Sequence, residues 1–345
     1  MKKLLVLLLV LSLVGLSFVG CGQDSKTAEV EKANDKVEGT GSASSEGNIP
    51  EDQFITILTG GSSGAYFALG GALSNLLNEN LSYANSSVES TGASAINATK
   101  IAMGDAEIAL AMNNVVSFAY NGVESFSEKG EFNNLRGIAG LYPNHCQVVT
   151  LKKTGITQIE DLVGKNVGVG APGSGTEVDA RNILAIYGIT YDDIDEDFLS
   201  YAESIEQLKN GTVDAAFLTS GLPNATIMDL STTHKVVIVP VRVDKVKELA
   251  EKMPYYKTEV IPAGTYDNDT DVETAAVVSM LITREDLDEQ VVYDITKVLF
   301  ENLQTLIDTH SVAKKIDVGK YYEGMPIPLH PGAERYFKEI GVLHQ

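Results

Sequence analysis

The sequence predicts an α/β fold of two similar lobes, with a ligand cleft between them. Strand-like apolar runs alternate with helix-like segments along residues 51–345, which is typical of parallel sheets covered by helices. A Gly/Ser-rich loop follows a strand-like run at residues 59–66 and again at residues 170–176. The order of strand, loop, helix, second helix, glycine stop and Ala-rich strand occurs once in each half.

In the first half, residues 54–58 form an apolar run typical of a strand, and leucines between residues 69 and 77 recur with helical spacing. A second helix is expected over residues 94–103, with Gly104 as its stop, because glycine often ends helices. Residues 105–112 then predict a buried strand.

The second half repeats this plan. We expect a strand at residues 166–169, helices at 180–187 and 204–209, and a buried strand at 214–219. The Pro- and Tyr-rich residues 253–266 resemble a connection between lobes.

The last part of the chain adds three elements. Residues 274–282 predict a strand, and residues 291–310 predict one long amphipathic helix. A rigid Pro-rich stretch at residues 326–336 precedes a last short helix.

The N-terminal residues predict export and anchoring. Residues 1–20 carry two lysines and then an apolar run, typical of a secretory signal peptide. A small residue before Cys21 resembles a lipoprotein cleavage site, so Cys21 is the expected lipidation site. Residues 21–50 are then a lipidated cysteine and a flexible tether, since they hold too few apolar side chains to fold. The predicted location is the outer face of the cytoplasmic membrane.

Composition excludes several classes of protein. The formal net charge of −21 argues against nucleic-acid binding. Besides Cys21 the only cysteine is Cys146, and the five histidines are scattered, so we predict no metal site and no cofactor.

The two Gly/Ser-rich loops predict anion binding. Each places backbone N–H groups and small hydroxyls near a helix start, where the helix dipole is positive. The site residues expected to line the cleft are Gly61, Ser62, Ser63, Tyr66, Ser94, Asn97, Asn113, Asn114, Ser174, Gly175, Thr176 and Ser220, with Thr219 and Asn224 as further candidates. Ser94 and Asn97 have a plain alternative as helix-capping residues.

Residues 60–64 also match the G-x-S-x-G pattern of a serine hydrolase, with Ser62 as the nucleophile and His330 as the base candidate. This alternative stays open, although the pattern follows the first strand of the folded region and no oxyanion loop precedes it. Prolines on both sides of His330 favour a structural turn instead.

Many ordered segments of this chain resemble the TAXI group of solute receptors of tripartite (TRAP) transporters. The matching segments include Thr59-Gly60-Gly61, Gly64-Ala65-Tyr66, Thr91-Gly92-Ala93-Ser94 with Asn97, Gly173-Ser174-Gly175-Thr176-Glu177, Gly221-Leu222-Pro223-Asn224 and residues 69–73, 119–122, 161–165, 261–266 and 328–336.

The resemblance implies a periplasmic-binding-protein fold of the second type, without catalysis. One lobe is expected to comprise residues 51–145 plus 262–345, and the other residues 146–261. The implied function is capture of a small carboxylate such as glutamate, glutamine or 2-oxoglutarate and its delivery to an integral membrane TRAP permease. A receptor of an ABC importer with the same fold is the alternative. The sequence departs from the family at Ala65 and Phe67 and at residues 113–114.

Overall fold

The computed structural model describes residues 52–343. The predicted signal peptide (residues 1–20), Cys21 and the tether up to residue 50 lie outside the described residues. Within residues 52–343, no helix is both long enough and apolar enough to cross a membrane. The α/β class is confirmed, because helices alternate with the strands of a mixed sheet.

The first part of the sheet is parallel, as predicted. Its strands are β1 (Gln53–Leu58), β2 (Ala84–Glu89) and β3 (Ile108–Met112), and β1 pairs with both others. Each strand is followed by a helix: α1 (Ala65–Asn80), α2 (Ser94–Met103) and α3 (Asn113–Asn121). Leu69, Leu73 and Leu77 of α1 are buried, so the leucine spacing correctly predicted the face of α1 that packs into the core.

The second part repeats the parallel arrangement. Its strands are β5 (Asn166–Gly168), β6 (Asp195–Asp197) and β7 (Ala215–Ser220), and β5 pairs with both others. Its helices are α4 (Gly175–Ile186), α5 (Tyr201–Asn210), α6 (Ala225–Thr233) and α7 (Val243–Lys252). Helix α5 starts earlier than predicted because the Ser200 hydroxyl accepts a hydrogen bond from the Glu203 N–H, and the Glu203 carboxylate accepts one from the Ser200 N–H.

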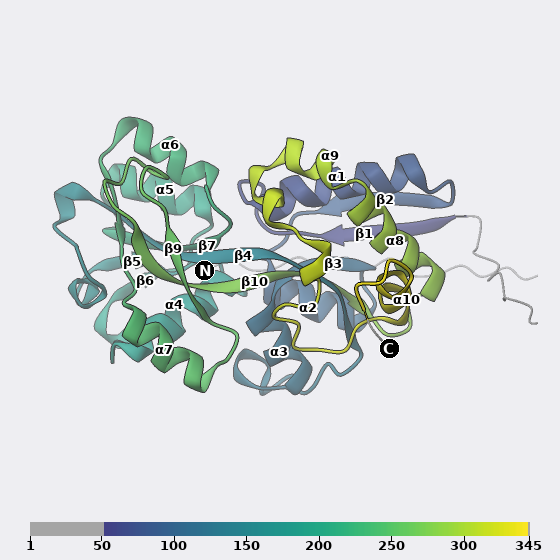
Figure 1. Cartoon of the computed structure of the whole chain (residues 1–345). Coiled ribbons are helices and arrows are strands. Elements are labelled where there is room, and N and C mark those ends of the chain that lie inside the picture. Colours follow the sequence, from purple (N-terminus) through teal and green to yellow (C-terminus); the bar gives the residue numbers. More distant parts are fainter. Residues whose placement is uncertain (1–51, 344–345) are drawn as a thin grey trace, which may run out of the picture. The chain divides into compact units, whose positions relative to one another are not determined.

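Two long strands join the two parts into one sheet. β4 (Leu135–Leu151) and β10 (Val272–Arg284) pair with each other antiparallel, and Figure 1 shows them running together between the two sets of helices. Beyond His145, β4 pairs instead with β7 and with β8 (Val236–Val239), while the start of β10 pairs with β9 (Lys257–Ile261).

The expectation of purely parallel sheets is therefore wrong. The strand predicted at residues 274–282 is confirmed within β10. Hydrophobic runs mark buried strands but carry no strand direction, so the antiparallel direction of β10 relative to β4 could not be predicted from them. The lobe boundaries at residues 145/146 and 261/262 stay a prediction.

The C-terminal helices cover the first part of the sheet. The single helix predicted over residues 291–310 is two helices, α8 (Glu289–Glu301) and α9 (Leu303–Thr309), because Asn302 leaves the helical conformation. The last helix is α10 (Pro331–Glu339), which packs on α8. Phe300 of α8 stacks on Tyr336 of α10 with ring centroids 6.2 Å apart.

Candidate functional site

A cavity of about 100 Å³ lies where the Gly/Ser-rich loops of the two parts face each other. It is formed at the carboxyl ends of β1, β3 and β7, where open α/β sheets bind ligands. The lining residues are Gly60, Gly61, Ser63, Gly64, Ala65, Tyr66, Thr91, Gly92, Ala93, Met112, Asn144, Ala171, Ser174, Gly175, Thr176, Ser200, Tyr201, Thr219 and Ser220.

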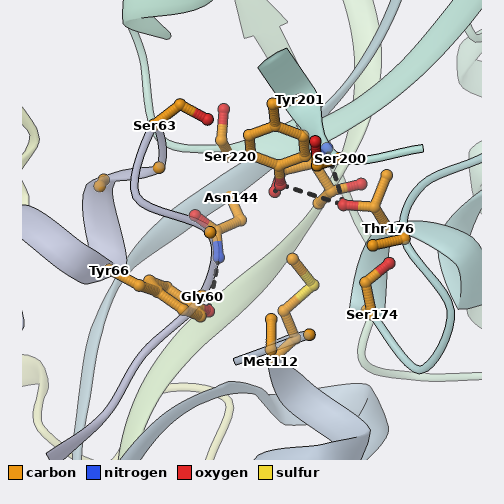
Figure 2. Close-up of a pocket in the computed structure, with 18 of the residues that line it drawn as sticks. Gly60, Ser63, Tyr66, Met112, Asn144, Ser174, Thr176, Ser200, Tyr201 and Ser220 are labelled. Carbon is orange, nitrogen blue, oxygen red and sulfur yellow. Dashed lines mark hydrogen bonds between the residues drawn. The ribbon is translucent and has the colours of Figure 1, made fainter. Parts of the chain in front are cut away.

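The first loop brings the uncapped start of α1 to the cavity. Gly64 is the N-cap residue of α1 and provides no side-chain cap. Consequently the backbone N–H groups of Ala65 and Tyr66 have no hydrogen-bond acceptor among residues 52–343. The Tyr66 ring is buried, and its hydroxyl accepts a hydrogen bond from Asn144 Nδ2 at 3.0 Å (Figure 2).

The second loop brings the start of α4 to the opposite wall. Gly173 has a φ of 72°, a left-handed conformation that glycine adopts without strain. The Ser174 hydroxyl oxygen caps α4 by accepting from the Glu177 N–H at 3.1 Å. A Cβ on Gly175 would lie 2.3 Å from Met112 Sδ, so a larger residue at this position beside the cavity requires the Met112 side chain to move.

A chain of hydrogen bonds holds the wall between α4, α5 and β7. The Tyr201 hydroxyl donates to the Thr219 carbonyl at 2.6 Å, and the Thr219 N–H donates to Thr176 Oγ1 at 3.3 Å. The Thr176 and Tyr201 hydroxyls are 3.0 Å apart, which closes the chain (Figure 2). These three residues are therefore fixed by one another rather than by a ligand.

Four helices begin at this cavity. The N-cap residues Gly64 of α1, Ala93 of α2, Ser174 of α4 and Ser200 of α5 all line it. None of the lining residues in the described chain is charged. The groups that form the wall itself are therefore the positive helix ends and neutral hydrogen-bonding groups.

The two parts of the sheet also contact each other beside the cavity. The Ala95 N–H of α2 donates to the Gly173 carbonyl at 3.1 Å. Asn114 Nδ2 of α3 donates to Asp179 Oδ1 of α4 at 2.8 Å. These contacts close the cavity on the side of α2 and α3.

Seven of the predicted site residues line the cavity: Gly61, Ser63, Tyr66, Ser174, Gly175, Thr176 and Ser220. Of the two further candidates, Thr219 lines it and Asn224 does not. Asn224 instead caps α6, its Oδ1 accepting from the Thr226 and Ile227 N–H groups. Whether the seven residues touch a ligand stays a prediction.

Three of the predicted residues lie elsewhere in the first part of the chain. Ser62 is exposed on the first loop and does not line the cavity. Ser94 is fully buried, and its hydroxyl oxygen accepts from the Met112 N–H at 3.1 Å. Asn97 is also fully buried, and its Nδ2 donates to the Thr59 and Leu110 carbonyls, both at 2.7 Å. Ser94 and Asn97 thus connect α2 to strands, which is a structural role.

Asn113 and Asn114 are likewise bound within the protein. Asn113 Nδ2 donates to the Gly324 carbonyl at 3.0 Å, and its Oδ1 accepts from the Val278 N–H at 3.0 Å. Asn114 lies in the contact between α3 and α4 described above. Neither lines the cavity, because α3 starts directly after β3 and turns both side chains into the protein interior.

Asp179 is the buried acid in this contact between the two parts. The Tyr256 hydroxyl donates to its Oδ1 at 2.7 Å, and Oδ2 has no hydrogen-bond partner among the described residues. Burial raises the pKa of Asp179 from 3.8 to about 6, although the hydrogen bonds from Tyr256 and Asn114 oppose this rise.

Sequence reasoning missed Asn144, Tyr201 and Met112 as lining residues. Asn144 lies within the unpredicted strand β4, and Tyr201 begins α5 before its predicted start. The capping pattern of Ser200 followed by Glu203 was the available signal for Tyr201. For Asn144, no local pattern in the sequence indicated that it would line the cavity.

A second hollow, of about 560 Å³, lies beside β9. None of the predicted site residues lines it. Its charged groups include the ion pair of Lys257 with Glu323, whose Nζ and Oε1 atoms are 2.6 Å apart. We assign the functional site to the smaller cavity because both Gly/Ser-rich loops meet there.

The structure does not bring together the residues of the serine hydrolase alternative. His330 does not line the cavity, its Nδ1 accepts from the Gly332 N–H, and its Nε2 lies 3.0 Å from the Leu287 carbonyl oxygen. No group of three or more His, Cys, Asp or Glu residues within 52–343 is arranged to hold a metal ion.

The fold is similar to that of several solved binding proteins. PhnD1 from Prochlorococcus marinus, in complex with methylphosphonate, has a TM-score of 0.53 and 11% identity, covering 84% of this chain and 99% of its own. The periplasmic aliphatic sulphonate binding protein SsuA from Escherichia coli has a TM-score of 0.47 and 14% identity, covering 83% of both chains. A histidine-bound ABC uptake transporter substrate binding protein from Streptococcus pneumoniae has a TM-score of 0.46 and 16% identity, covering 76% and 92%. The similarity to PhnD1 confirms the predicted periplasmic-binding-protein fold.

The assignment to the TAXI receptors of TRAP transporters is wrong, and so is the TRAP permease as partner. The family model that matches is a different one, that of the NMT1-like family. Several of the segments that suggested TAXI receptors, such as Thr59-Gly60-Gly61 and Gly173-Ser174-Gly175-Thr176, consist of glycine and small polar residues, which are common in loops that start a helix. Since the match extends over residues 57–341, the chain belongs to the NMT1-like family.

Proposed function

We propose that this chain is the extracytoplasmic solute-binding receptor of an ABC importer. The observation that carries the proposal is the cavity between the two parts of the sheet, to which both Gly/Ser-rich loops contribute. The fold shared with PhnD1 supports a binding protein. The sequence left two kinds of transporter open as the partner, and with the TRAP permease excluded the ABC importer is the one that remains.

The receptor acts by closing around its solute. The contacts Ala95–Gly173 and Asn114–Asp179 join the two parts beside the cavity, so they form only when the parts approach each other. A solute that touches both loops favours this closed arrangement, and the importer then recognises the closed form.

Catalysis is not part of the proposal. The cavity holds serine and threonine hydroxyls but no histidine, lysine or carboxylate that could activate them. Ser62, the nucleophile of the hydrolase alternative, is exposed outside the cavity.

Solute binding is tested by identifying what co-purifies with the protein. Small molecules released by denaturing the purified chain are identified by mass spectrometry and then titrated back by calorimetry. Gly175→Ala should weaken this binding, because the new Cβ would lie 2.3 Å from Met112 Sδ and displace this side chain within the cavity wall. Gly71→Ala is the matched control, since a Cβ there has no atom within 4 Å. Equal binding by wild type and Gly175→Ala would refute this site.

The importer is tested separately from the solute. The ATPase complex that recognises this chain is reconstituted in vesicles, and ATP hydrolysis is measured with the solute-loaded chain outside. We expect hydrolysis to rise with the loaded wild-type chain and to rise less with Gly175→Ala. Absence of any rise, with solute binding intact, would exclude the importer but keep the binding protein.

We further propose that Cys21 anchors the receptor to the outer face of the cytoplasmic membrane. The support is the sequence alone: an apolar leader, a small residue and then Cys21. In cells, Cys21→Ser should release the chain from the membrane fraction and stop incorporation of labelled fatty acid. Unchanged membrane association of the variant would exclude the anchor.

A further inference from the structure

The cavity offers positive potential without a positive side chain. Helices α1, α2, α4 and α5 begin there, with lengths of 16, 10, 12 and 10 residues. Each contributes the positive end of its dipole, equivalent to roughly half an elementary charge. No lining residue is Asp, Glu, Lys, Arg or His, so no charged side chain forms part of the cavity wall.

The first backbone donors of α1 and α4 are not used by the protein. The N–H groups of Ala65 and Tyr66, and those of Gly175 and Thr176, have no acceptor among residues 52–343. Ser174 is 6% exposed, and its hydroxyl accepts from the Glu177 N–H but donates to none of the described residues. The cavity thus presents an excess of donors, which is complementary to an oxyanion.

A positively charged group finds no partner in the same cavity. The nearby acid that is buried, Asp179, does not line it. Its Oδ1 already accepts from Tyr256 at 2.7 Å and Asn114 at 2.8 Å. An ammonium group in the cavity would lose its hydration and face helix N-termini of the same sign, without a carboxylate to compensate.

We propose that this cavity takes a small oxyanion that carries no ammonium group, and that it discriminates against amino acids. The inference rests on the proposed function and narrows its solute class. Carboxylate, phosphonate and sulfonate groups share the required chemistry. The apolar part of the wall, which includes Met112, Ala93 and Ala171, fits a short hydrocarbon substituent. Glutamate and glutamine, expected from the sequence, are therefore excluded as solutes.

The test compares pairs of molecules that differ by one amino group. Calorimetric titrations at pH 7.5 use propionate with alanine, succinate with aspartate, glutarate with glutamate, methylphosphonate with aminomethylphosphonate, and ethanesulfonate with taurine. We expect the member without the amino group to bind at least roughly tenfold more tightly in every pair that binds. The pair with the highest affinity identifies the type of oxyanion.

A negative charge placed in the cavity should weaken its preference for anions over their amino analogues. Gly61 lines the cavity, and a Cβ on it would have no atom within 4 Å, so a side chain fits there. Gly61→Asp should weaken binding of the preferred anion and narrow or reverse its advantage over the amino analogue. Gly61→Asn is the control of matched shape, and it should keep the wild-type preference.

The outcomes separate this inference from the proposed function. Tighter binding of the amino member in any pair, or binding only of neutral or cationic solutes, overturns the inference and leaves a solute receptor in place. Equal preference in Gly61→Asp and Gly61→Asn also overturns it, because the preference would then not be electrostatic. If no small molecule binds or co-purifies, both the inference and the proposed function fail.

Discussion

Replacing Asp179 with asparagine should stabilise the protein at neutral pH, although it removes a buried, hydrogen-bonded carboxylate. The side chain is fully buried, and its Oδ2 has no partner among the described residues. In Asp179→Asn the new Oδ1 keeps the bonds from Tyr256 and Asn114. The new Nδ2 faces the Thr219 hydroxyl, which lies beside the carboxylate and has no other partner among the described residues.

The size of the effect follows from the pKa of Asp179. The folded-state value of about 6 lies above the ordinary value of 3.8, so between these pH values the folded protein binds more protons than the unfolded chain. The free energy of unfolding therefore falls as the pH rises from about 4 to about 6, by roughly 3 kcal/mol in total. The neighbouring Cys146 and Tyr256 stay protonated through this range, because burial raises the pKa of each well above its ordinary value.

Urea unfolding at pH 4 and at pH 7.5, without added solute, measures this effect. Wild type and Asp179→Asn should be similar at pH 4, and the variant should be more stable by up to about 3 kcal/mol at pH 7.5. Asp192→Asn is the control, since Asp192 is exposed and loses the same charge. A variant that is less stable than wild type at pH 7.5, or a difference that does not shrink at pH 4, would contradict this reasoning.

Three further substitutions test the other assignments. Asn97→Ala should lower the free energy of unfolding in urea by roughly 3 kcal/mol, because it removes the two buried hydrogen bonds that Nδ2 donates to the Thr59 and Leu110 carbonyls. An unchanged free energy of unfolding would contradict the structural role of Asn97. Tyr201→Phe should lower the free energy of unfolding by about 1 kcal/mol. It should also weaken solute binding in calorimetry, because Thr176 loses its hydroxyl partner; an unchanged affinity would show that the hydrogen bonds of Tyr201 do not position the cavity wall. Ser62→Ala should leave solute affinity unchanged, and neither protein should hydrolyse p-nitrophenyl acetate; hydrolysis lost in the variant would restore the hydrolase alternative.

The parts of the fold and site that could be predicted are those with local causes. Ser174, Gly175 and Thr176 were placed at a helix start from their residue types, and they line the cavity there. This succeeded because capping chemistry depends on a few consecutive residues. The leucine spacing of α1 identified its buried face for the same reason.

The predictions that were wrong concern residues whose roles depend on contacts with distant parts of the chain. Asn97 and Asn114 are polar residues near strand or helix ends, as cleft residues are, and only their distant partners show that they are structural. Strand β4 was missed because it contains Gly137, Gly140 and Pro143, which usually interrupt strands. Gly140 is required there, because a Cβ on it would lie 2.8 Å from the Glu323 carbonyl oxygen, and a Cβ on Gly137 would lie 2.2 Å from Met325 Sδ and displace that side chain.

The uncapped start of α1 has a consequence for cooperativity. Its first N–H groups have no acceptor among the described residues, and α4 faces it across the cavity with its own free N–H groups. An oxyanion between them serves as a common cap for helices from both parts of the sheet. Binding of the solute then couples the fraying of α1 to that of α4, two helices whose first residues are more than a hundred positions apart in the chain. Amide hydrogen exchange in the first turns of both helices should therefore slow together when the solute binds.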